Sequence, residues 1–203
     1  MCPRGRWQGN RHPGFETMAR VSVIIPTYNR EAFVVKAIRS AQNQSFQDHE
    51  IIVVDDGSTD QSRAALEPYR GSIRYIYEEN SGASAARNVG VKADRGEWLA
   101  FLDSDVEWNP EYRSTQAQRA GEAPGVCMQT TNCLFIGLDG QTKSYFEING
   151  SRAEFKGQDY LHFRGAFRFI IKHGPWQVGA TIIHGDAIKR AGSRYQCIDS
   201  HYG

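Results

Sequence analysis

Three short apolar runs constrain the fold of this chain most, because polar residues follow each run directly. The runs and their followers are VSVII before PTYN (residues 21–29), IIVV before DDGS (51–58) and WLAFL before DSD (98–105). Short runs rich in β-branched residues are typical of buried strands. In open α/β sheets, ligands bind at the carboxyl ends of the strands. The sequence therefore predicts a sheet with a binding site along one edge.

Helical patterns separate these runs. The further segments expected up to residue 97 are helices over 33–41, 60–69 and 81–94 and a strand over 73–77. The residues expected to face inward are Phe33, Val34, Ala37, Ile38 and Ala41 in the first helix and Ala64, Ala65 and Leu66 in the second, which Ser58 or Thr59 can cap. Strands separated by single helices pair in parallel through right-handed crossovers. We therefore expect an α/β fold with a mostly parallel sheet.

The pattern is weaker beyond residue 109. The segments expected there are strands over 126–130, 134–136, 142–148 and 178–183, a hairpin turn at Asp139-Gly140 and a helix over 186–191. Residues 151–176 are irregular and rich in aromatic side chains, which either line a groove or belong to the core. They include Tyr160, Phe163, Phe167, Phe169 and Trp176. This half predicts a smaller, mixed portion of the fold.

Length and composition exclude several classes of protein. The chain has 203 residues, which suit one α/β domain over 20–203, preceded by a Gly-, Arg- and Pro-rich extension over 1–19 that we expect to be disordered. Lys and Arg number 24 against 23 Asp and Glu, so no general attraction to nucleic acid is expected. No apolar run is long enough to span a membrane. Four scattered cysteines without a signal peptide favour the cytoplasm.

The pair Asp103 and Asp105 is the most specific chemical pattern. Two carboxylates at the end of a strand repel each other unless a proton or a cation lies between them. Oxygen ligands of this kind suit Mg²⁺ or Mn²⁺, and such a cation can in turn bind a diphosphate. The alternative is an exposed acidic turn.

Two other strand ends carry candidates with structural alternatives. Tyr28 can stack on a base, and Asn29 and Arg30 can reach phosphate or ribose, but the aromatic ring can also cover the edge of the core. Asp55 and Asp56 can accept hydrogen bonds from a ribose hydroxyl or a base N–H, or one of them can cap the following helix.

Residues 81–88 place small side chains at the start of a helix and a cation one turn later. Ser81 and Gly82 allow a ribose or a phosphate to approach the backbone, and Arg87 can neutralise it. Close packing of helix on sheet, with Arg87 at the surface, is the alternative. His184 and His201 can act as ligands or proton relays, although a single histidine is more often structural.

In order and spacing, the motifs VSVIIPTYNR, IIVVDDGSTD and NSGASAARNVGVKADRGEWLAFLDSD resemble the family 2 glycosyltransferases. The resemblance implies the GT-A fold and an inverting transferase that uses a nucleotide-sugar donor, with a UDP-sugar as the expected donor, and a divalent cation, Mn²⁺ or Mg²⁺. Residues 20–106 would form the nucleotide-sugar-binding half and 107–203 the acceptor-side half. A sugar or lipid-linked acceptor, glycan synthesis, and a place at the inner face of the membrane are also implied.

The resemblance also implies roles for single residues. Pro26, Tyr28 and Asp56 would hold the base and ribose, and Arg87 would lie near the ribose and diphosphate. Asp103 would contact the ribose or a metal-bound water, and Asp105 would ligate the metal. The remaining residues expected to line the nucleotide-sugar site are Thr27, Asn29, Arg30, Asp55, Ser81, Gly82 and Ser104.

The catalytic base is expected near the carboxyl terminus. The segment 179–192 resembles the stretch that precedes an acidic Glu-Asp motif in the family, and here Ile198 and Asp199 stand at that motif. Asp199 is therefore the candidate base, or else an ordinary polar residue. Family members continue with a helix after this motif, so the chain is short at this end. A truncated, non-catalytic nucleotide-sugar-binding remnant is thus the alternative function. A nucleotidyltransferase is a weaker third possibility, because the first strand lacks a Gly-rich basic loop.

Overall fold

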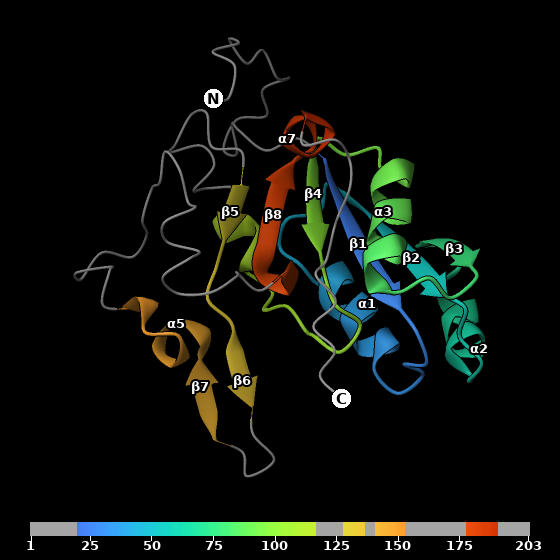
Figure 1. Cartoon of the computed structure of the whole chain (residues 1–203), viewed down its shortest axis with the longest axis horizontal. Coiled ribbons are helices and arrows are strands. Elements are labelled where there is room, and N and C mark those ends of the chain that lie inside the picture. Colours follow the sequence, from blue (N-terminus) through green and yellow to red (C-terminus); the bar gives the residue numbers. More distant parts are fainter. Residues whose placement is uncertain (1–19, 117–127, 137–140, 153–177, 191–203) are drawn as a thin grey trace. The chain divides into compact units, whose positions relative to one another are not determined.

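The structure is a computed structural model that describes residues 20–116, 128–136, 141–152 and 178–190 (Figure 1). Several sequence predictions lie outside these residues: the disordered extension over 1–19, the turn at Asp139-Gly140, nearly all of the aromatic segment over 151–176, and Asp199 with His201. Among the described residues, no helix is both long enough and apolar enough to cross a membrane.

A six-stranded sheet with strand order β3-β2-β1-β4-β8-β5 is the centre of the fold. Its strands are β1 (Val21–Thr27), β2 (His49–Asp56), β3 (Arg74–Glu78), β4 (Trp98–Phe101), β5 (Met128–Thr130) and β8 (Thr181–His184). The pairs β1–β2, β1–β4 and β2–β3 are parallel, and β4–β8 is antiparallel. The prediction of a mostly parallel α/β sheet is therefore confirmed.

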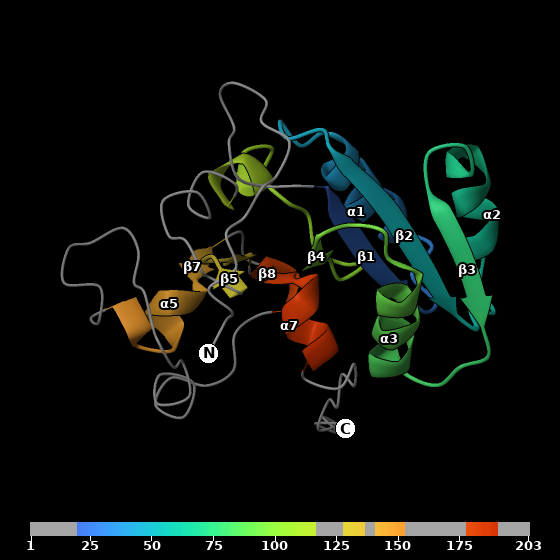
Figure 2. The same cartoon turned by 90° about the horizontal axis from the view of Figure 1, so that it is seen from above.

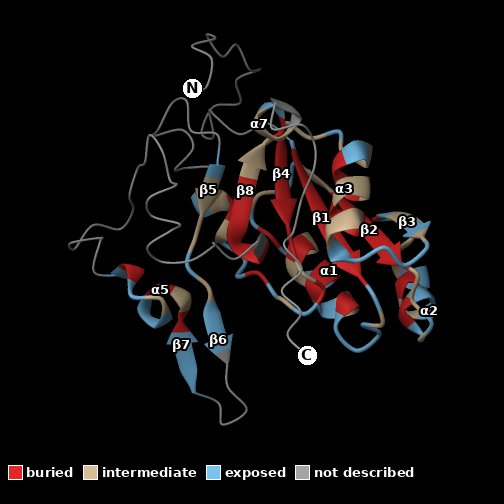
Figure 3. Cartoon of the chain, in the orientation of Figure 1, coloured by how far each residue is buried: buried red, intermediate tan, exposed pale blue. Residues whose placement is uncertain are grey.

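Helices cover both faces of this sheet. Alternate side chains of a strand point to opposite faces, so Val53 packs with α1 (Val34–Gln42), whereas Ile52 packs with α3 (Ala83–Ala93). Figure 2 shows α1 and α3 on opposite sides of the sheet. The strands β1, β2 and β4 are largely buried between the two layers (Figure 3). Among the described residues, these two helices cover the faces of the sheet and not the edges where the strands begin and end.

Helix α3 lies unusually close to β1. Gly90, in the middle of α3, faces Ile24, and a Cβ atom at this position would overlap Cγ2 of Ile24. A glycine is therefore required for the helix to approach the strand so closely. The consequence is that α3 has a fixed position over the centre of the sheet.

The structure corrects five details of the sequence prediction. Phe33 precedes α1 and is 47% exposed, so it does not face inward. The helix expected over 60–69 is α2 (Ser62–Leu66), followed by the 3₁₀ helix η1 (Glu67–Tyr69), because Pro68 lacks the N–H that another α-helical turn needs. Within α2 it is Ser62, and not Ala64, that is buried. Residues 178–180 form the 3₁₀ helix η3 before β8.

The fifth correction concerns residues 145–148, which form the helix α5 (Tyr145–Ile148) instead of extending the strand β7 (Thr142–Ser144). The hydroxyl of Ser144 accepts a hydrogen bond from the backbone N–H of Glu147. The carboxylate of Glu147 accepts one from the N–H of Ser144 in return. This capping box satisfies two backbone donors at once and starts a helix where the apolar pattern alone predicts a strand.

The chain divides into two compact units, of which one comprises Thr130–Thr181 and the other contains the remaining residues. In the smaller unit, β6 (Leu134–Ile136) pairs with β7 in an antiparallel hairpin that precedes α5. The larger unit contains nearly all of the main sheet, its helices, and α7 (Gly185–Arg190). The prediction that function divides between residues 20–106 and 107–203 stays a prediction.

Candidate functional site

The carboxyl ends of β2, β1 and β4 bring most of the predicted site residues to one edge of the sheet. Asp55 in β2 lies beside Thr27 in β1, and Phe101 in β4 lies beside Ile24. The residues after β4 therefore reach the level at which β1 and β2 end. All of these residues belong to the larger unit, so the geometry of the edge is defined within it.

Asp55 is fully buried and has two protein partners. One carboxylate oxygen, Oδ1, accepts a hydrogen bond from the backbone N–H of Ser58 (2.9 Å), and Oδ2 accepts one from the hydroxyl of Tyr75 (2.6 Å). Burial and the hydrogen bond to Asp55 raise the pKa of Tyr75 well above its usual range, so this hydroxyl remains a donor. The arrangement ties the end of β2 to β3.

Asp56 points instead to the start of α3. Its Oδ1 accepts the N–H of Ser81 (2.7 Å), and its Oδ2 accepts the N–H of Gly82 (2.9 Å). No side chain of α3 itself caps this end, and Gly82 has a positive φ of 91°. A carboxylate here satisfies free backbone donors and interacts favourably with the helix dipole. Asp56 therefore anchors the segment that carries Arg87.

Asn29 connects the loop after β1 with the loop after β2. It has a φ of 51°, in the left-handed region that asparagine tolerates better than most residues. Its side-chain oxygen accepts the N–H groups of Thr59 (2.8 Å) and Asp60 (3.3 Å), and its own N–H donates to Ser58 Oγ (3.0 Å). The side chain of Asn29 thus organises the edge, and Tyr28 before it is 45% exposed.

Arg87 and Asp103 form an ion pair at this edge. The guanidinium of Arg87 donates to Oδ1 of Asp103 at 2.6 Å, and the side chains are 10% and 32% exposed, respectively. Arg87 is thus a largely buried cation from α3 that meets the acidic segment after β4. The interpretation of Arg87 as a purely surface residue is wrong.

The remaining residues of the DSD segment have different surroundings. Ser104 is buried and Asp105 is exposed. The N–H of Val106 donates to the backbone oxygen of Asp103 (3.0 Å), which turns the chain between the two carboxylates. Among the described residues, no group of three or more His, Cys, Asp or Glu side chains gathers to hold a metal ion. A cation here would therefore need further oxygen ligands from a substrate or water.

The donor atoms at this position fit a hard divalent cation. Carboxylate oxygens are the ligands that Mg²⁺ and Mn²⁺ prefer, and such cations commonly keep water and substrate phosphate oxygens as their other ligands. One oxygen of Asp103 pairs with Arg87, while Asp105 is open to solvent. Asp105 is the more available ligand of the two.

Glu78 is a further residue at this edge that the sequence analysis did not single out. It ends β3 and lies beside Asp56 in the sheet. Burial, followed by the neighbouring charge of Asp56, raises its pKa. Its Oε1 and the hydroxyl of Thr27 are both buried without a hydrogen-bond partner in the described part of the chain. The sequence feature that could have indicated Glu78 was its position at the end of a third parallel strand.

His184 lies away from this edge. It is beside Trp98 at the amino end of β4, and its Nε2 is 3.5 Å from a carboxylate oxygen of Glu97. Its Nδ1 accepts the N–H of Asp186 (3.2 Å) at the start of α7. These contacts favour the structural interpretation of His184.

Comparison with known proteins gives a consistent result. The profile of the family described as "Glycosyl transferase family 2" matches residues 22–175. A Campylobacter jejuni protein named GalNAc(5)-diNAcBac-PP-undecaprenol beta-1,3-glucosyltransferase is 35% identical over 164 residues, which are 76% of this chain and 52% of the relative. The chain thus spans about half the length of that relative.

Two solved structures resemble the chain over most of its length. The crystal structure of S. aureus TarS 1-349 in complex with UDP-GlcNAc matches 87% of this chain and 48% of its own, with 25% identity and a TM-score of 0.60. The mannosyltransferase PcManGT from Pyrobaculum calidifontis, in complex with GDP-Man and Mn²⁺, matches 93% of this chain and 50% of its own, with 16% identity and a TM-score of 0.60. The second likeness concerns the fold alone.

Proposed function

Because the chain belongs to glycosyl transferase family 2 and has the GT-A fold, we propose that it transfers a sugar from a UDP-sugar to an acceptor hydroxyl with inversion. The observation that carries this proposal is the gathering of an exposed aromatic ring, a buried cation and two carboxylates at the carboxyl edge of the sheet. These groups are Tyr28, Arg87, Asp103 and Asp105. The TarS complex, whose title names UDP-GlcNAc, supports the choice of a uridine donor.

We assign the direct contacts to the accessible members of the edge. Tyr28 offers a ring on which the base can stack. The guanidinium of Arg87 and the partly exposed carboxylate of Asp103 face the ribose and the diphosphate. Further lining residues are Pro26, Thr27, Arg30, Ser81, Gly82 and Ser104.

Three residues with internal partners act mainly by positioning. Asp55 holds Tyr75 and the Ser58 turn, Asp56 holds the start of α3, and Asn29 holds the loop after β2. Pre-organised groups lose little conformational freedom when a ligand binds, which favours tight binding. The sequence prediction gave all three residues a direct role, and the proposal now differs on this point.

Asp105, with Asp103, would hold a divalent cation, Mn²⁺ or Mg²⁺. A bound cation supplies charge neutralisation for the departing nucleoside diphosphate. Arg87 adds a positive charge at the same edge, in a largely buried position where the electrostatic attraction is less screened than in water.

In the proposed reaction the acceptor oxygen forms a bond to the anomeric carbon while the bond from that carbon to the diphosphate oxygen breaks. The hydroxyl proton passes to a general base on the face opposite the leaving group. Asp199, outside the described residues, remains the candidate base. The name of the Campylobacter relative supports a lipid-linked acceptor and a role in glycan synthesis.

Calorimetric titration of UDP in the presence of Mn²⁺ tests the metal assignment. We expect Asp105→Ala to weaken UDP binding at least tenfold, because the variant lacks a metal ligand. Glu107→Ala is the matched control, since Glu107 is also exposed and lies only two residues away. Equal affinities for the wild type and Asp105→Ala would show that Asp105 does not hold a metal.

Turnover separates the transferase from a module that binds the donor without transferring its sugar. Slow hydrolysis of a UDP-sugar that is lost in Asp199→Asn would establish catalysis. Donor binding without any turnover over a panel of UDP-sugars would favour the binding module.

A further inference from the structure

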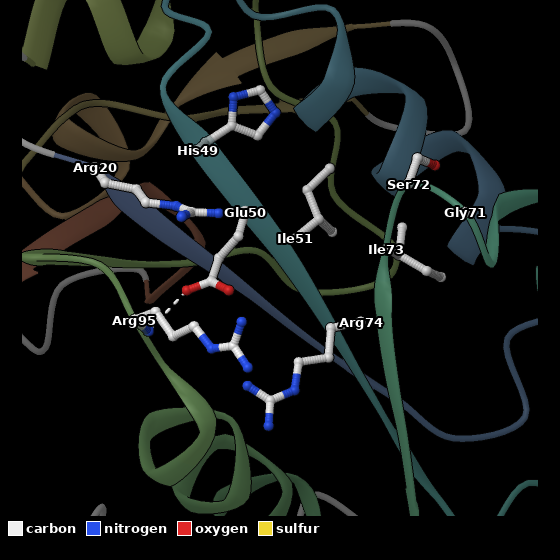
Figure 4. A pocket seen from close by; sticks show the side chains of 9 residues that line it. All are labelled: Arg20, His49, Glu50, Ile51, Gly71, Ser72, Ile73, Arg74 and Arg95. Carbon is white, nitrogen blue, oxygen red and sulfur yellow. Dashed lines mark hydrogen bonds between the residues drawn. The ribbon is translucent and has the colours of Figure 1, made fainter.

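A second charged hollow lies at the opposite edge of the sheet, where β1, β2 and β3 begin. It has a volume of about 580 Å³, and its polar lining consists of Arg20, His49, Glu50, Ser72, Arg74 and Arg95 (Figure 4). Residue 49 begins β2 and Asp56 ends it, so the two edges are separated by the eight residues of β2. At about 3.3 Å per residue the hollow is roughly 23 Å from the proposed donor site. It is therefore a separate location.

Three guanidinium groups from three different segments line this hollow. Arg20 precedes β1, Arg74 begins β3, and Arg95 follows α3. In Figure 4 the guanidinium groups of Arg74 and Arg95 point toward one another. No carboxylate of the described residues forms an ion pair with any of the three. Like charges that converge in this way are stabilised when an anion lies between them.

The existing partners of these side chains do not neutralise them. Arg74 donates to the backbone oxygen of Ala93 (2.6 Å), a neutral acceptor at the end of α3. The one carboxylate in the lining, Glu50, accepts the hydroxyl of Ser22 (2.6 Å) and the backbone N–H of Arg95 (2.7 Å) through Oε1. Glu50 thus holds the loop between α3 and β4, to which Arg95 belongs. Its negative charge offsets only one of the three positive charges.

His49 adds no positive charge to the hollow at neutral pH. Its Nδ1 is 3.0 Å from Nη2 of the fully buried Arg113. A guanidinium has only donors, so Nδ1 must be the acceptor and the ring is neutral. Burial, followed by the charge of Arg113, lowers the pKa of His49 to about 4. The positive character of the hollow therefore comes from the arginines alone.

We propose that this hollow binds a phosphate group, either as a phosphate monoester or as part of a diphosphate. The planar guanidinium of arginine forms paired hydrogen bonds to phosphate oxygens, and three such groups line the hollow. The phosphate belongs either to a small soluble molecule or to the headgroup of an anionic lipid. The inference depends only on the arginines at the amino edge, and not on the proposed transferase activity.

Titration with inorganic diphosphate in the presence of EDTA tests the soluble source, because the chelator removes any metal-dependent binding at the other edge. We expect the full chain to bind, and we expect Arg95→Gln and Arg74→Gln each to weaken binding about tenfold. Lys36→Gln is the matched control, since it removes an exposed positive charge from the first turn of α1. Arg95→Lys keeps the positive charge but not the paired hydrogen bonds, so it should weaken binding less than Arg95→Gln does, which separates loss of charge from loss of fold.

Flotation with vesicles tests the lipid source. Phosphatidylcholine vesicles with and without phosphatidic acid present the same surface with and without a phosphate monoester headgroup. Capture that requires phosphatidic acid and is lost in Arg95→Gln would identify a lipid headgroup, whereas binding of diphosphate alone would identify a soluble ligand. The proposal is overturned if neither ligand binds, or if Lys36→Gln weakens binding as much as the two arginine variants do.

Discussion

The two edges of the main sheet differ in how their charged groups are compensated. At the carboxyl edge, the charges of Arg87 and Asp103 meet in an ion pair, and both oxygens of Asp55 and of Asp56 accept hydrogen bonds. At the amino edge, the charges of Arg74 and Arg95 face each other, and no carboxylate of the described residues forms an ion pair with either. The carboxyl edge is thus organised before any ligand binds, whereas the amino edge has an excess of positive charge.

This difference shows that the number of charged residues at an edge does not by itself indicate whether their side chains are already arranged to bind a ligand. A pre-organised edge binds a ligand with little further ordering of its side chains. An edge with uncompensated like charges gains stability from the ligand itself. Perturbing the two edges separately tests whether this distinction holds.

The largest effect on stability is expected from Asp56→Ala. This change removes the acceptor of two N–H groups at the start of α3 and should lower the free energy of unfolding by about 2–3 kcal/mol. Urea unfolding measures the change, and Glu79→Ala, an exposed residue near the same loop, should alter stability by less than about 0.5 kcal/mol. An unchanged midpoint for Asp56→Ala would mean that the carboxyl edge is not organised through this anchor.

A smaller effect is expected from Tyr75→Phe, which removes the hydroxyl that donates to Asp55. The buried carboxylate then loses one partner, and the free energy of unfolding should fall by about 1–2 kcal/mol. Tyr77→Phe is the control, because Tyr77 lies in the same strand and is 55% exposed. Similar losses in both variants would contradict the role given to the bond between Tyr75 and Asp55.

The smallest effect is expected at the amino edge, from the titration of His49. Its pKa of about 4 in the folded chain lies below the ordinary value of 6.5, so the unfolded chain binds more protons between these values. The free energy of unfolding should therefore have its full value above pH 6.5. It should decrease by about 1 kcal/mol as the pH falls toward 4, after allowance for solvent screening. Thermal unfolding at several pH values should show that the stability of His49→Gln falls less steeply with decreasing pH than that of the wild type. An equally steep fall in both would mean that other groups cause the effect.

Sequence alone predicted the sheet and the edge at which the candidate site residues gather, because both follow from short-range periodicity. The partners of individual carboxylates were not predictable in the same way. Asp55 and Asp56 are neighbours in the sequence, yet alternation along a strand sends one to Tyr75 and the other to Ser81 and Gly82. Which partner each residue meets depends on elements that are distant in the sequence.

Other features were hidden for different physical reasons. The helix α5 depends on the reciprocal hydrogen bonds of Ser144 and Glu147, which outweigh the apolar pattern of residues 142–148. The burial of Arg113 against His49 joins segments 64 residues apart, so no local pattern indicates it. The roles of the site residues and of Asp199 stay predictions.

The close fit of α3 has a mechanical consequence. Its first turn is fastened to β2 through Asp56, its middle touches β1 at Gly90, and its last turn accepts a hydrogen bond from Arg74 of β3. A helix attached at both ends and in the middle cannot slide along its axis without losing contacts on three strands. We therefore expect any adjustment to an incoming substrate to occur in the loops and in side-chain rotamers, while α3 itself stays in place.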